Sequence, residues 1–353
     1  MFDYLIVGSG LAGVAMAETL RERGRTICLF DDASRKASLV AAGLYNPVVL
    51  KRLNLTWKGE ELMDFSLPFY EKLQQRLKGH FDEKLPILRR LASAEEQNAW
   101  FEAADRPGLS RFLSTRLVRN VHDGLQAPHG FGEVLETGRL HTARLLHAYR
   151  EELHEKGRLR AESFVHGALE LNRDHLAYKG IRARRIIFCE GFGMRGNPFF
   201  DYLPLQGSKG ELLTVRIPGL GETRIVKSDI FLIPLGADRY KVGATYARND
   251  FDPEPTARAR EELTAKLRKI VNRDFEVEGQ SAGIRPTVPD RRPLVGRHPE
   301  HDALFALNGM GSRGVLLAPY AAACLADFME EGRPLPPEMD LSRYAKFYGR
   351  TAP

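Results

Sequence analysis

Apolar residues near the amino terminus recur with the spacing of alternating strands and helices. An apolar run over residues 4–7 predicts a buried strand, and the pattern that follows over 14–23 is that of a helix. A second strand is predicted over 26–30, and amphipathic helices are predicted over 59–78 and 142–155. This order of strand, helix and strand is typical of a parallel sheet covered by helices.

The second half of the chain has a different pattern. Short apolar segments between turn residues predict antiparallel strands over 164–165, 168–171, 176–178, 185–189, 210–217, 230–234 and 240–243. Helices are predicted over 256–271 and 315–330, and Gly332 and Pro334 end the second of them. We therefore expect a mixed fold, α/β and α+β, in which a parallel-sheet domain is interleaved with an antiparallel-sheet domain.

The turn between the first strand and the first helix has the glycine spacing of a dinucleotide site. Gly8 allows a tight turn, Gly10 lets the backbone approach a pyrophosphate, and Gly13 lets helix and strand pack closely. Leu11 and Ala12 complete this turn, and the free N–H groups of the new helix face the phosphate charge. A glycine-rich turn alone is weak evidence, but here it follows a strand and opens a helix.

An acidic residue follows the second predicted strand at the distance that this site requires. Asp31 can accept hydrogen bonds from the adenosine ribose hydroxyls, and Asp32 stands beside it. The sequence therefore predicts a Rossmann-like domain that binds a dinucleotide.

The composition fits a globular protein of about two domains. Of the 353 residues, 43% are hydrophobic and 28% charged, which is enough to build a sizeable core. No segment approaches the run of about 20 apolar residues that a membrane span needs, and no signal-peptide pattern precedes the first strand. Cys28, Cys189 and Cys324 lie far apart in apolar segments and are predicted to be buried thiols. A cytoplasmic location is expected.

The net charge of +6 leaves an interaction with nucleic acid open. Basic residues gather over 106–119, 182–185 and 258–269, but apolar or acidic residues interrupt each stretch, which favours solvated surfaces. The histidine pairs at 141 and 147 and at 298 and 301 are also assigned to solvated surface. No metal site and no nucleophile with an adjacent base is expected.

Four further segments, in this order along the chain, resemble the D-amino-acid oxidase and glycine oxidase family. They are the Ala-Ala-Gly-Leu stretch within 40–47, the strand and turn over 186–191, the Gly-Ile-Arg-Pro segment within 281–296, and the glycine-rich loop and helix start over 308–319. The resemblance runs from the first residue to about Gly332. It implies FAD as the dinucleotide, with NAD as the minor alternative.

The family's architecture implies discontinuous domains. The FAD-binding domain is expected over 1–80, 139–200 and 287–353, and the substrate-binding domain over 81–138 and 201–286. The antiparallel strands predicted between residues 201 and 286 would then form the substrate side of the molecule.

The resemblance also implies which residues border a noncovalently bound flavin, most of them small enough to let the backbone approach it. Beyond the first turn they are Ala42, Gly43, Leu44, Gly191, Gly309, Gly311, Ser312, Gly314 and Val315. A helix start beside the flavin would favour negative charge on the reduced ring. The alternative is that these segments are ordinary turns that need positive φ.

Arg285 and Arg313 are the candidate catalytic and substrate-binding residues. Arginine presents a planar, permanently charged fork that matches a carboxylate, and in this family arginines at the two motif positions hold the substrate carboxylate over the flavin. The alternative for each is an ordinary ion pair. The resemblance further implies that the substrate C–H delivers hydride to the flavin while the protein supplies position and electrostatics.

Two positions depart from the family pattern. Phe231 stands where a tyrosine commonly helps to bind the carboxylate, and it has no hydroxyl to donate. Tyr246 and Tyr202 are candidates to supply one from elsewhere, and Phe231 and Tyr246 are therefore expected at the substrate. Glu190 replaces a small or neutral residue, and its carboxylate is expected to point away from the FAD phosphates.

A second resemblance concerns the substrate. The segments over 203–211, 243–246 and 310–319 are similar to the FAD oxidase domain of bifunctional enzymes that make 5-methylaminomethyl-2-thiouridine in tRNA. Such a domain oxidises a carboxymethylamino group on the wobble uridine. Because the glycine fingerprint begins so close to residue 1, no methyltransferase domain is expected before it.

Three functions follow from these patterns. The first is an FAD-dependent oxidoreductase that oxidises the C–N bond of a small amine or amino acid bearing a carboxylate. The alternatives are a tRNA wobble-uridine oxidase and an FAD-binding protein without amine oxidase activity. The amine, the electron acceptor and the oligomeric state are left open.

Overall fold

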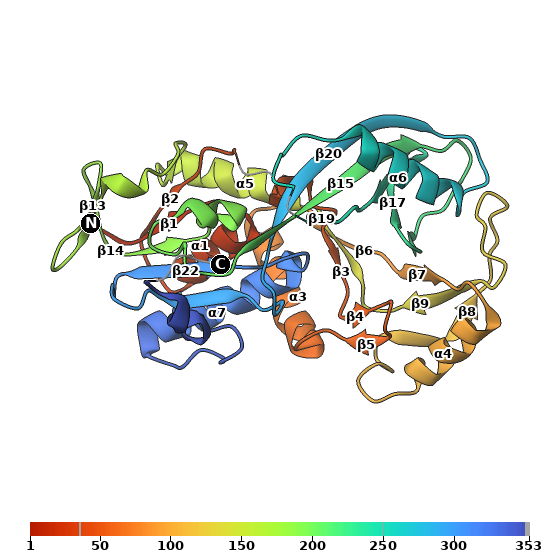
Figure 1. The fold of residues 1–353 in the computed structure, drawn as a ribbon, viewed down its shortest axis with the longest axis horizontal. Helices are drawn as coiled ribbons and strands as arrows, with labels where there is room; N and C mark the ends of the chain where they lie inside the picture. The colour runs from red at the N-terminus through yellow and green to blue at the C-terminus, as the bar shows by residue number, and fades with distance from the viewer. Residues whose placement is uncertain (35–36, 249, 350–353) are drawn as a thin grey trace.

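The computed structural model has two lobes side by side, and it describes every position except 35–36, 249 and 350–353 (Figure 1). These positions fall within the predicted domain segments 1–80, 201–286 and 287–353, whose assignment there lies outside the described residues. One lobe contains a mainly parallel sheet and the other a mainly antiparallel sheet. The predicted fold class is confirmed, and the domain boundaries stay a prediction.

The first lobe is built on an eight-stranded sheet. Its central path is β11 (Leu159–Arg160), β2 (Ile27–Phe30), β1 (Phe2–Val7), β14 (Ile181–Phe188), β13 (Leu176–Tyr178) and β12 (Leu169–Leu171), with β22 (Leu304–Asn308) beside β14 and β21 (Leu294–Arg297) beside β22. The strands β11, β2, β1, β14 and β22 are parallel, and the other three join antiparallel. The predicted antiparallel meander is confirmed for β12 to β14, but residues 164–165 form no strand.

The central strand β1 is apolar throughout because both faces of the sheet are covered. Ile6 faces the helices α1 (Leu11–Glu22), α3 (Gly59–Arg76), α5 (Thr142–Glu155) and α7 (Gly314–Glu331). Leu5 faces a second core that contains Phe200 and Leu304. A ligand therefore cannot bind on either face. It can bind at the edge of the sheet that the carboxyl ends of β1, β2 and β14 form.

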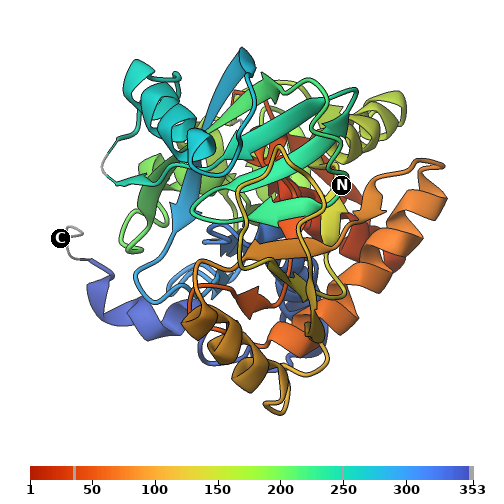
Figure 2. The same cartoon turned by 90° about the vertical axis from the view of Figure 1, so that its right-hand side faces the viewer.

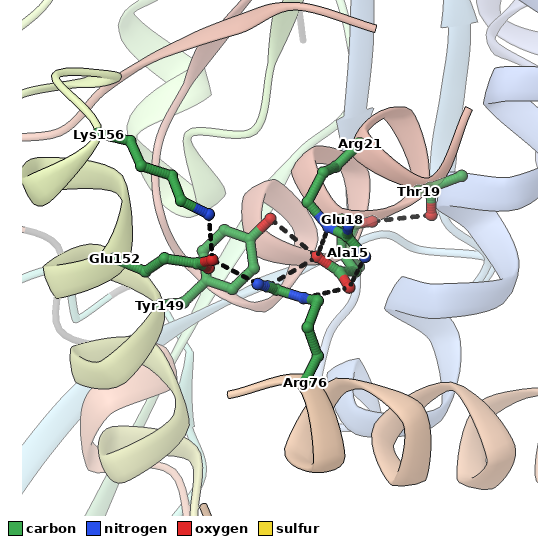
Figure 3. A network of polar contacts seen from close by, with 8 residues as sticks. All are labelled: Ala15, Glu18, Thr19, Arg21, Arg76, Tyr149, Glu152 and Lys156. Carbon is green, nitrogen blue, oxygen red and sulfur yellow. Dashed lines mark hydrogen bonds and ion pairs between the residues drawn. The ribbon is translucent and has the colours of Figure 1, made fainter. Parts of the chain in front are cut away.

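A buried ion network holds three of these helices together (Figure 3). Glu18 of α1 is 2% exposed, and Arg21 and Arg76 each donate two hydrogen bonds of 2.9 Å to its carboxylate. Tyr149 of α5 donates a further bond of 3.2 Å, and Arg76 also reaches Glu152. Burial by itself would raise the pKa of Glu18, but the two arginines outweigh it and the pKa is lowered.

The second lobe is built on a nine-stranded sheet. Its order is β19 (Ala247–Arg248), β15 (Gln206–Arg216), β18 (Arg239–Gly243), β17 (Phe231–Gly236), β16 (Ile225–Lys227), β7 (Ile87–Arg90), β9 (Phe131–Val134) and β8 (Leu113–Val118), and β20 (Glu276–Thr287) pairs with β15. Helix α6 (Ala257–Arg268) packs on one face, where Leu263 contacts the core that contains Leu232 and Val242. Helix α4 (Ala94–Ala104) packs on the other, and the two helices lie on opposite sides of the sheet (Figure 2).

Short elements join the lobes. A three-stranded sheet consists of β3 (Leu44–Tyr45), β10 (Gly138–Leu140) and β6 (Asp82–Lys84), and a two-stranded one of β4 (Val48–Val49) and β5 (Asn54–Leu55). The remaining helices are α2 (Ala37–Val40) and the 3₁₀ helices η1 (His166–Ala168), η2 (Gly191–Gly196) and η3 (Leu341–Phe347). The long strands β15 and β20 run from the first lobe into the second, as Figure 1 shows.

Candidate functional site

Two positions in and beside the turn after β1 have no room for a side chain. Gly8 has φ +102°, and a Cβ added there would lie 2.5 Å from the carbonyl oxygen of Cys189. A Cβ on Gly13 would lie 1.8 Å from the carbonyl oxygen of Gly8. Glycine is therefore required at both positions so that helix α1 can start directly against the sheet.

The amino-terminal end of α1 has no capping side chain at its N-cap position. Gly10 is the N-cap residue, no side chain caps the helix in the usual position, and no acidic residue stands in its first turn. The backbone N–H of Leu11 donates to the Ser38 hydroxyl at 3.3 Å. Because the helix dipole and free N–H groups favour an anion there, this end fits the pyrophosphate of a dinucleotide.

Asp31 lies at the end of β2, next to this turn. It accepts a hydrogen bond of 2.5 Å from the backbone N–H of Ser9, and Arg150 of α5 pairs with it at 2.9 Å. Arg150 also donates to the Ser9 hydroxyl. Asp32 accepts a hydrogen bond from Ser163. Asp31 is thus fixed at the place predicted for the ribose, and Arg150 is a neighbour that the sequence pattern did not reveal.

The Ala-Ala-Gly-Leu stretch passes close to the small sheet between the lobes. Gly43 has φ +72°, and a Cβ there would lie 1.9 Å from the carbonyl oxygen of Leu140. Ala42 and Leu44 pack against an apolar cluster that also contains Phe231 as a partly buried member. The predicted flavin segment and a predicted substrate residue therefore pack against the same apolar cluster.

The glycine-rich loop before α7 lies beside the other predicted cofactor segments. Gly309 and Gly311 have φ of +73° and +54°. The N–H of Gly311 donates to the carbonyl of Pro286 at 2.8 Å, and a Cβ on Gly314 would lie 3.3 Å from the Leu11 side chain. The start of α7 therefore lies beside the start of α1 and beside the end of β20.

Helix α7 also begins without a cap. Its N-cap residue, Arg313, makes no side-chain capping bond, and no acidic residue stands in the first turn, which contains Val315 after Ser312 and Arg313. Asn308 donates to the carbonyl of Gly191 at 2.8 Å, which ties the loop to the turn after β14. A second uncapped helix start fits a group that carries partial negative charge, as a flavin does.

Arg285 and Arg313 are both half-buried, and the Tyr246 phenol influences the charge of each. The Arg285 guanidinium is 4.4 Å from the centre of the Tyr246 ring, and its Nη1 donates to the carbonyl of Thr245 at 3.3 Å. Arg313 donates to the carbonyl of Asn46 at 3.1 Å. Burial lowers the pKa of each arginine, and the Tyr246 phenol opposes this at both. Among the described residues, neither arginine has a carboxylate within 4.0 Å.

The sequence analysis missed the residue that makes room for Arg285. A Cβ on Gly210 of β15 would lie 1.9 Å from Nη2 of Arg285, so the guanidinium rests flat on the glycine. Tyr246 itself is 68% exposed and covers the other side. The stack of glycine, guanidinium and phenol holds Arg285 in one orientation.

Phe231 and Tyr202 differ in their relation to these arginines. Phe231 begins β17, opposite Gly243, and Lys227 lies over its ring at 4.8 Å. Tyr202 is 3% exposed and packs with Phe200 in the core of the first lobe. Tyr246 is therefore the better placed of the two tyrosines that could supply a hydroxyl.

The carboxylate of Glu190 is held by two partners. His166 lies 2.9 Å from one oxygen, and Asn197 donates to the other at 2.8 Å. Its Cα would be 3.4 Å from a Cβ on Gly8, so the backbone borders the fingerprint turn while the carboxylate is engaged with His166 and Asn197.

One assignment of the histidines to solvated surface is wrong. His298 is 2% exposed, its ring stacks on His301 at 4.7 Å, and burial lowers its pKa to about 4. Its Nδ1 accepts the backbone N–H groups of Glu300 and His301. His298 is a structural residue of the first lobe, because a neutral imidazole caps this turn. Cys28 and Cys189 are buried thiols as predicted, and Cys324 is half-buried.

A match to a family model identifies the protein family to which these segments belong. Residues 3–328 match the model described as DAO, FAD dependent oxidoreductase. The chain belongs to the DAO family. It is therefore an FAD-dependent amine oxidoreductase, and the family match agrees with the two uncapped helix starts and the glycine-lined turns described above.

Curated relatives and solved structures agree with the family. A glycine oxidase from Bacillus licheniformis is 25% identical over 93% of each chain. The tRNA 5-methylaminomethyl-2-thiouridine biosynthesis bifunctional protein MnmC from Azoarcus sp. is 27% identical over 96% of this chain, which spans 58% of that relative. An iminodiacetate oxidase from Chelativorans sp. has the same fold, with a TM-score of 0.78, 20% identity, and coverage of 97% of this chain and 98% of that one.

Within the described part of the chain, no helix combines the length and the apolar character that crossing a membrane requires.

Proposed function

We propose that this DAO family member oxidises the carbon–nitrogen bond of an amine that bears a carboxylate, of the amino-acid or N-substituted glycine type, with FAD bound noncovalently. The observation that carries the proposal is the pair Arg285 and Arg313. Both are half-buried, both are influenced by the Tyr246 phenol, and neither has a carboxylate partner among the described residues. A substrate carboxylate would supply the missing charge.

Each residue of the candidate site has a separate role in this proposal. Arg285 and Arg313 bind and orient the carboxylate, and Tyr246 covers Arg285 from the solvent side. Phe231 and Leu44 line the apolar part of the site and exclude water. FAD, when bound, supplies the hydride acceptor. No side chain in this set has to remove a proton from carbon, because positioning of the C–H bond is the main requirement.

A flavin-reduction experiment tests the proposal. The purified protein is mixed anaerobically with glycine, sarcosine, D-proline and other D-amino acids, and the flavin absorbance is followed. We expect at least one amine to bleach the flavin and Arg285→Ala to abolish the effect. Release of the flavin on denaturation tests noncovalent binding. If dithionite reduces the flavin and no amine does, the protein binds FAD without oxidising amines.

A tRNA substrate is the second candidate, supported by the 27% identity with the tRNA-modifying relative and by the positive net charge. The cluster over 182–185 is a poor docking surface for it. These residues lie in the first part of β14, about 10 to 20 Å along the strand from its far end at Phe188, which borders the candidate site. Bleaching by tRNA that contains carboxymethylaminomethyluridine, and by no free amine, would establish this function instead.

A further inference from the structure

A second pair of cations, both half-buried, lies near the candidate site. Arg139 is the middle residue of β10, where it stands opposite Leu44 of β3, the neighbour of the predicted flavin segment. Its Nη1 is 3.4 Å from the carbonyl of Pro234 on β17, so the side chain crosses from the small sheet to the large one. Lys241 lies on β18, opposite Ile233 of β17.

Strand register places Lys241 on the same face of the large sheet as Phe231. Val242 and Leu232 face α6 and belong to the core beneath it. Lys241 alternates with Val242 and therefore projects to the opposite face, the face of Phe231 and Ile233. Ile233 belongs to the apolar cluster against which Phe231, Ala42 and Leu44 pack. Arg139 and Lys241 thus border the same space as the predicted flavin segment.

These two cations lack the partners that buried charges usually have. Among the described residues, no carboxylate lies within 4.0 Å of Arg139 or Lys241. The Nε atom of Arg139 is buried and has no hydrogen-bond partner. Glu83, which stands opposite Arg139 on β6, is in contact with His141 instead.

The electrostatics of the pair are unfavourable without a ligand. Burial lowers the pKa of Arg139, and Glu83 only partly opposes it. Burial also lowers the pKa of Lys241, and the neighbouring Arg139 lowers it further. Two like charges held together out of water cost free energy, which an anion placed between them would offset.

We infer that the substrate amine carries a second acidic group, which Arg139 and Lys241 bind while Arg285 and Arg313 hold the first carboxylate. The inference rests on the proposed function and narrows its substrate class to amines with two acidic groups. Because Arg139 bridges the two sheets with its Nε buried, and Lys241 is half-buried, the ligand is a small molecule and not the backbone of a nucleic acid.

The test compares amines that differ in the second group. Flavin reduction is measured with iminodiacetate, with N-(phosphonomethyl)glycine and with N-ethylglycine, whose substituent is neutral. We expect kcat/KM for the better of the two acids to exceed that for N-ethylglycine about 30-fold, mainly through KM. Whichever acid is preferred identifies the second group as a carboxylate or as a phosphate-like group.

Variants then assign the preference to these residues. Lys241→Gln and Arg139→Gln should each reduce the preference to less than about fivefold while N-ethylglycine turnover changes little. Arg239→Gln is the matched control: it removes one cation from the same strand, but Arg239 is half exposed and paired with Glu278 at 2.7 Å. This control should keep the full preference.

Two outcomes overturn the inference while leaving the proposed function intact. One is equal kcat/KM for the acids and for N-ethylglycine in the unmodified protein. The other is a preference that survives in both Lys241→Gln and Arg139→Gln. If no amine reduces the flavin, the proposed function fails, and binding of iminodiacetate, measured by calorimetry on the flavin-loaded protein, still tests the pair: binding that is no weaker in Lys241→Gln overturns it.

Discussion

Two groups of charged side chains in this molecule differ in whether their members have partners of opposite charge. Around Glu18, every charge in the network has a partner: Arg21 and Arg76 share its carboxylate, and Glu152 receives Arg76. Around Tyr246 and β18 lie four half-buried cations, Arg285, Arg313, Arg139 and Lys241, yet no carboxylate of the described residues lies within 4.0 Å of any of them. Every charge of the first group is paired within the protein, whereas the cations of the second group need an anionic ligand as their partner.

The difference separates structure from function. A fully paired network adds little net stability over apolar packing but is costly to break, because a lone partner stays buried and charged. An unpaired group costs free energy in the absence of ligand and returns it on binding. Substitutions should therefore affect stability in the first group and catalysis in the second.

The largest effect is expected at Arg285. Arg285→Met should lower kcat/KM for carboxylate-bearing amines about 10³-fold, since a buried charge pair with the substrate is worth about 4 kcal/mol. The free energy of unfolding should stay unchanged or rise, because a desolvated charge is removed. Steady-state kinetics and urea denaturation of the same sample check both. A comparable loss in stability would mean that Arg285 is a structural residue.

At Glu18 we expect a smaller effect, which changes stability and not catalysis. Glu18→Gln should lower the free energy of unfolding by about 3 kcal/mol, because Arg21 and Arg76 lose their shared carboxylate in a buried position. The kcat of the folded enzyme should not change. Glu162→Gln is the control, since Glu162 pairs with Lys179 at an exposed site and should cost less than about 0.5 kcal/mol. Equal costs for the two variants would contradict the contrast.

Lys227 offers a pH-dependent comparison. Burial lowers its pKa from 10.5 to about 8. Between these values the unfolded chain holds the proton more often than the folded one, so this group makes stability rise with pH; below about pH 8 its full cost is present. Lys227→Met should therefore stabilise the protein by about 1 kcal/mol at pH 7.

That gain should shrink as the pH rises from about 8 to 10.5. Urea denaturation at pH 7 and pH 10 measures it. The exposed Lys179, whose pKa is raised, is the control, and Lys179→Met should show no gain at pH 7. A Lys227→Met gain that is the same at both pH values would show that packing rather than charge causes it.

The smallest effect is expected at Arg111, which pairs with Asp64 at 2.6 Å and with Glu136 at 2.7 Å. The geometry resembles that around Glu18, but all three side chains are well exposed. Arg111→Gln should change the free energy of unfolding by no more than about 0.5 kcal/mol, and high salt should remove the difference. A loss near that of Glu18→Gln would show that pairing, and not burial, sets the cost.

The sequence by itself determined the parts of this protein that depend on local backbone geometry. The turn at Gly8 and Gly13 was predictable, because no side chain fits between helix and strand there. The order of motifs predicted loops at both Arg285 and Arg313; this is confirmed for Arg313, the N-cap residue of α7, and wrong for Arg285, which lies in strand β20 opposite Ser208 of β15. Helix α5 was predicted with both of its bounds because its apolar spacing and the glycine after it are local signals.

Only the tertiary structure decided which side chains have partners. Arg139 and Lys241 are about 100 positions apart, and no spacing or motif connects them; two strand registers and the contact with Pro234 do so. The buried state of His298 was missed for the same reason, because a loop rich in polar residues gives no sign of what packs over it. Local patterns fix backbone shape, whereas desolvation and pairing depend on neighbours that are distant in the chain.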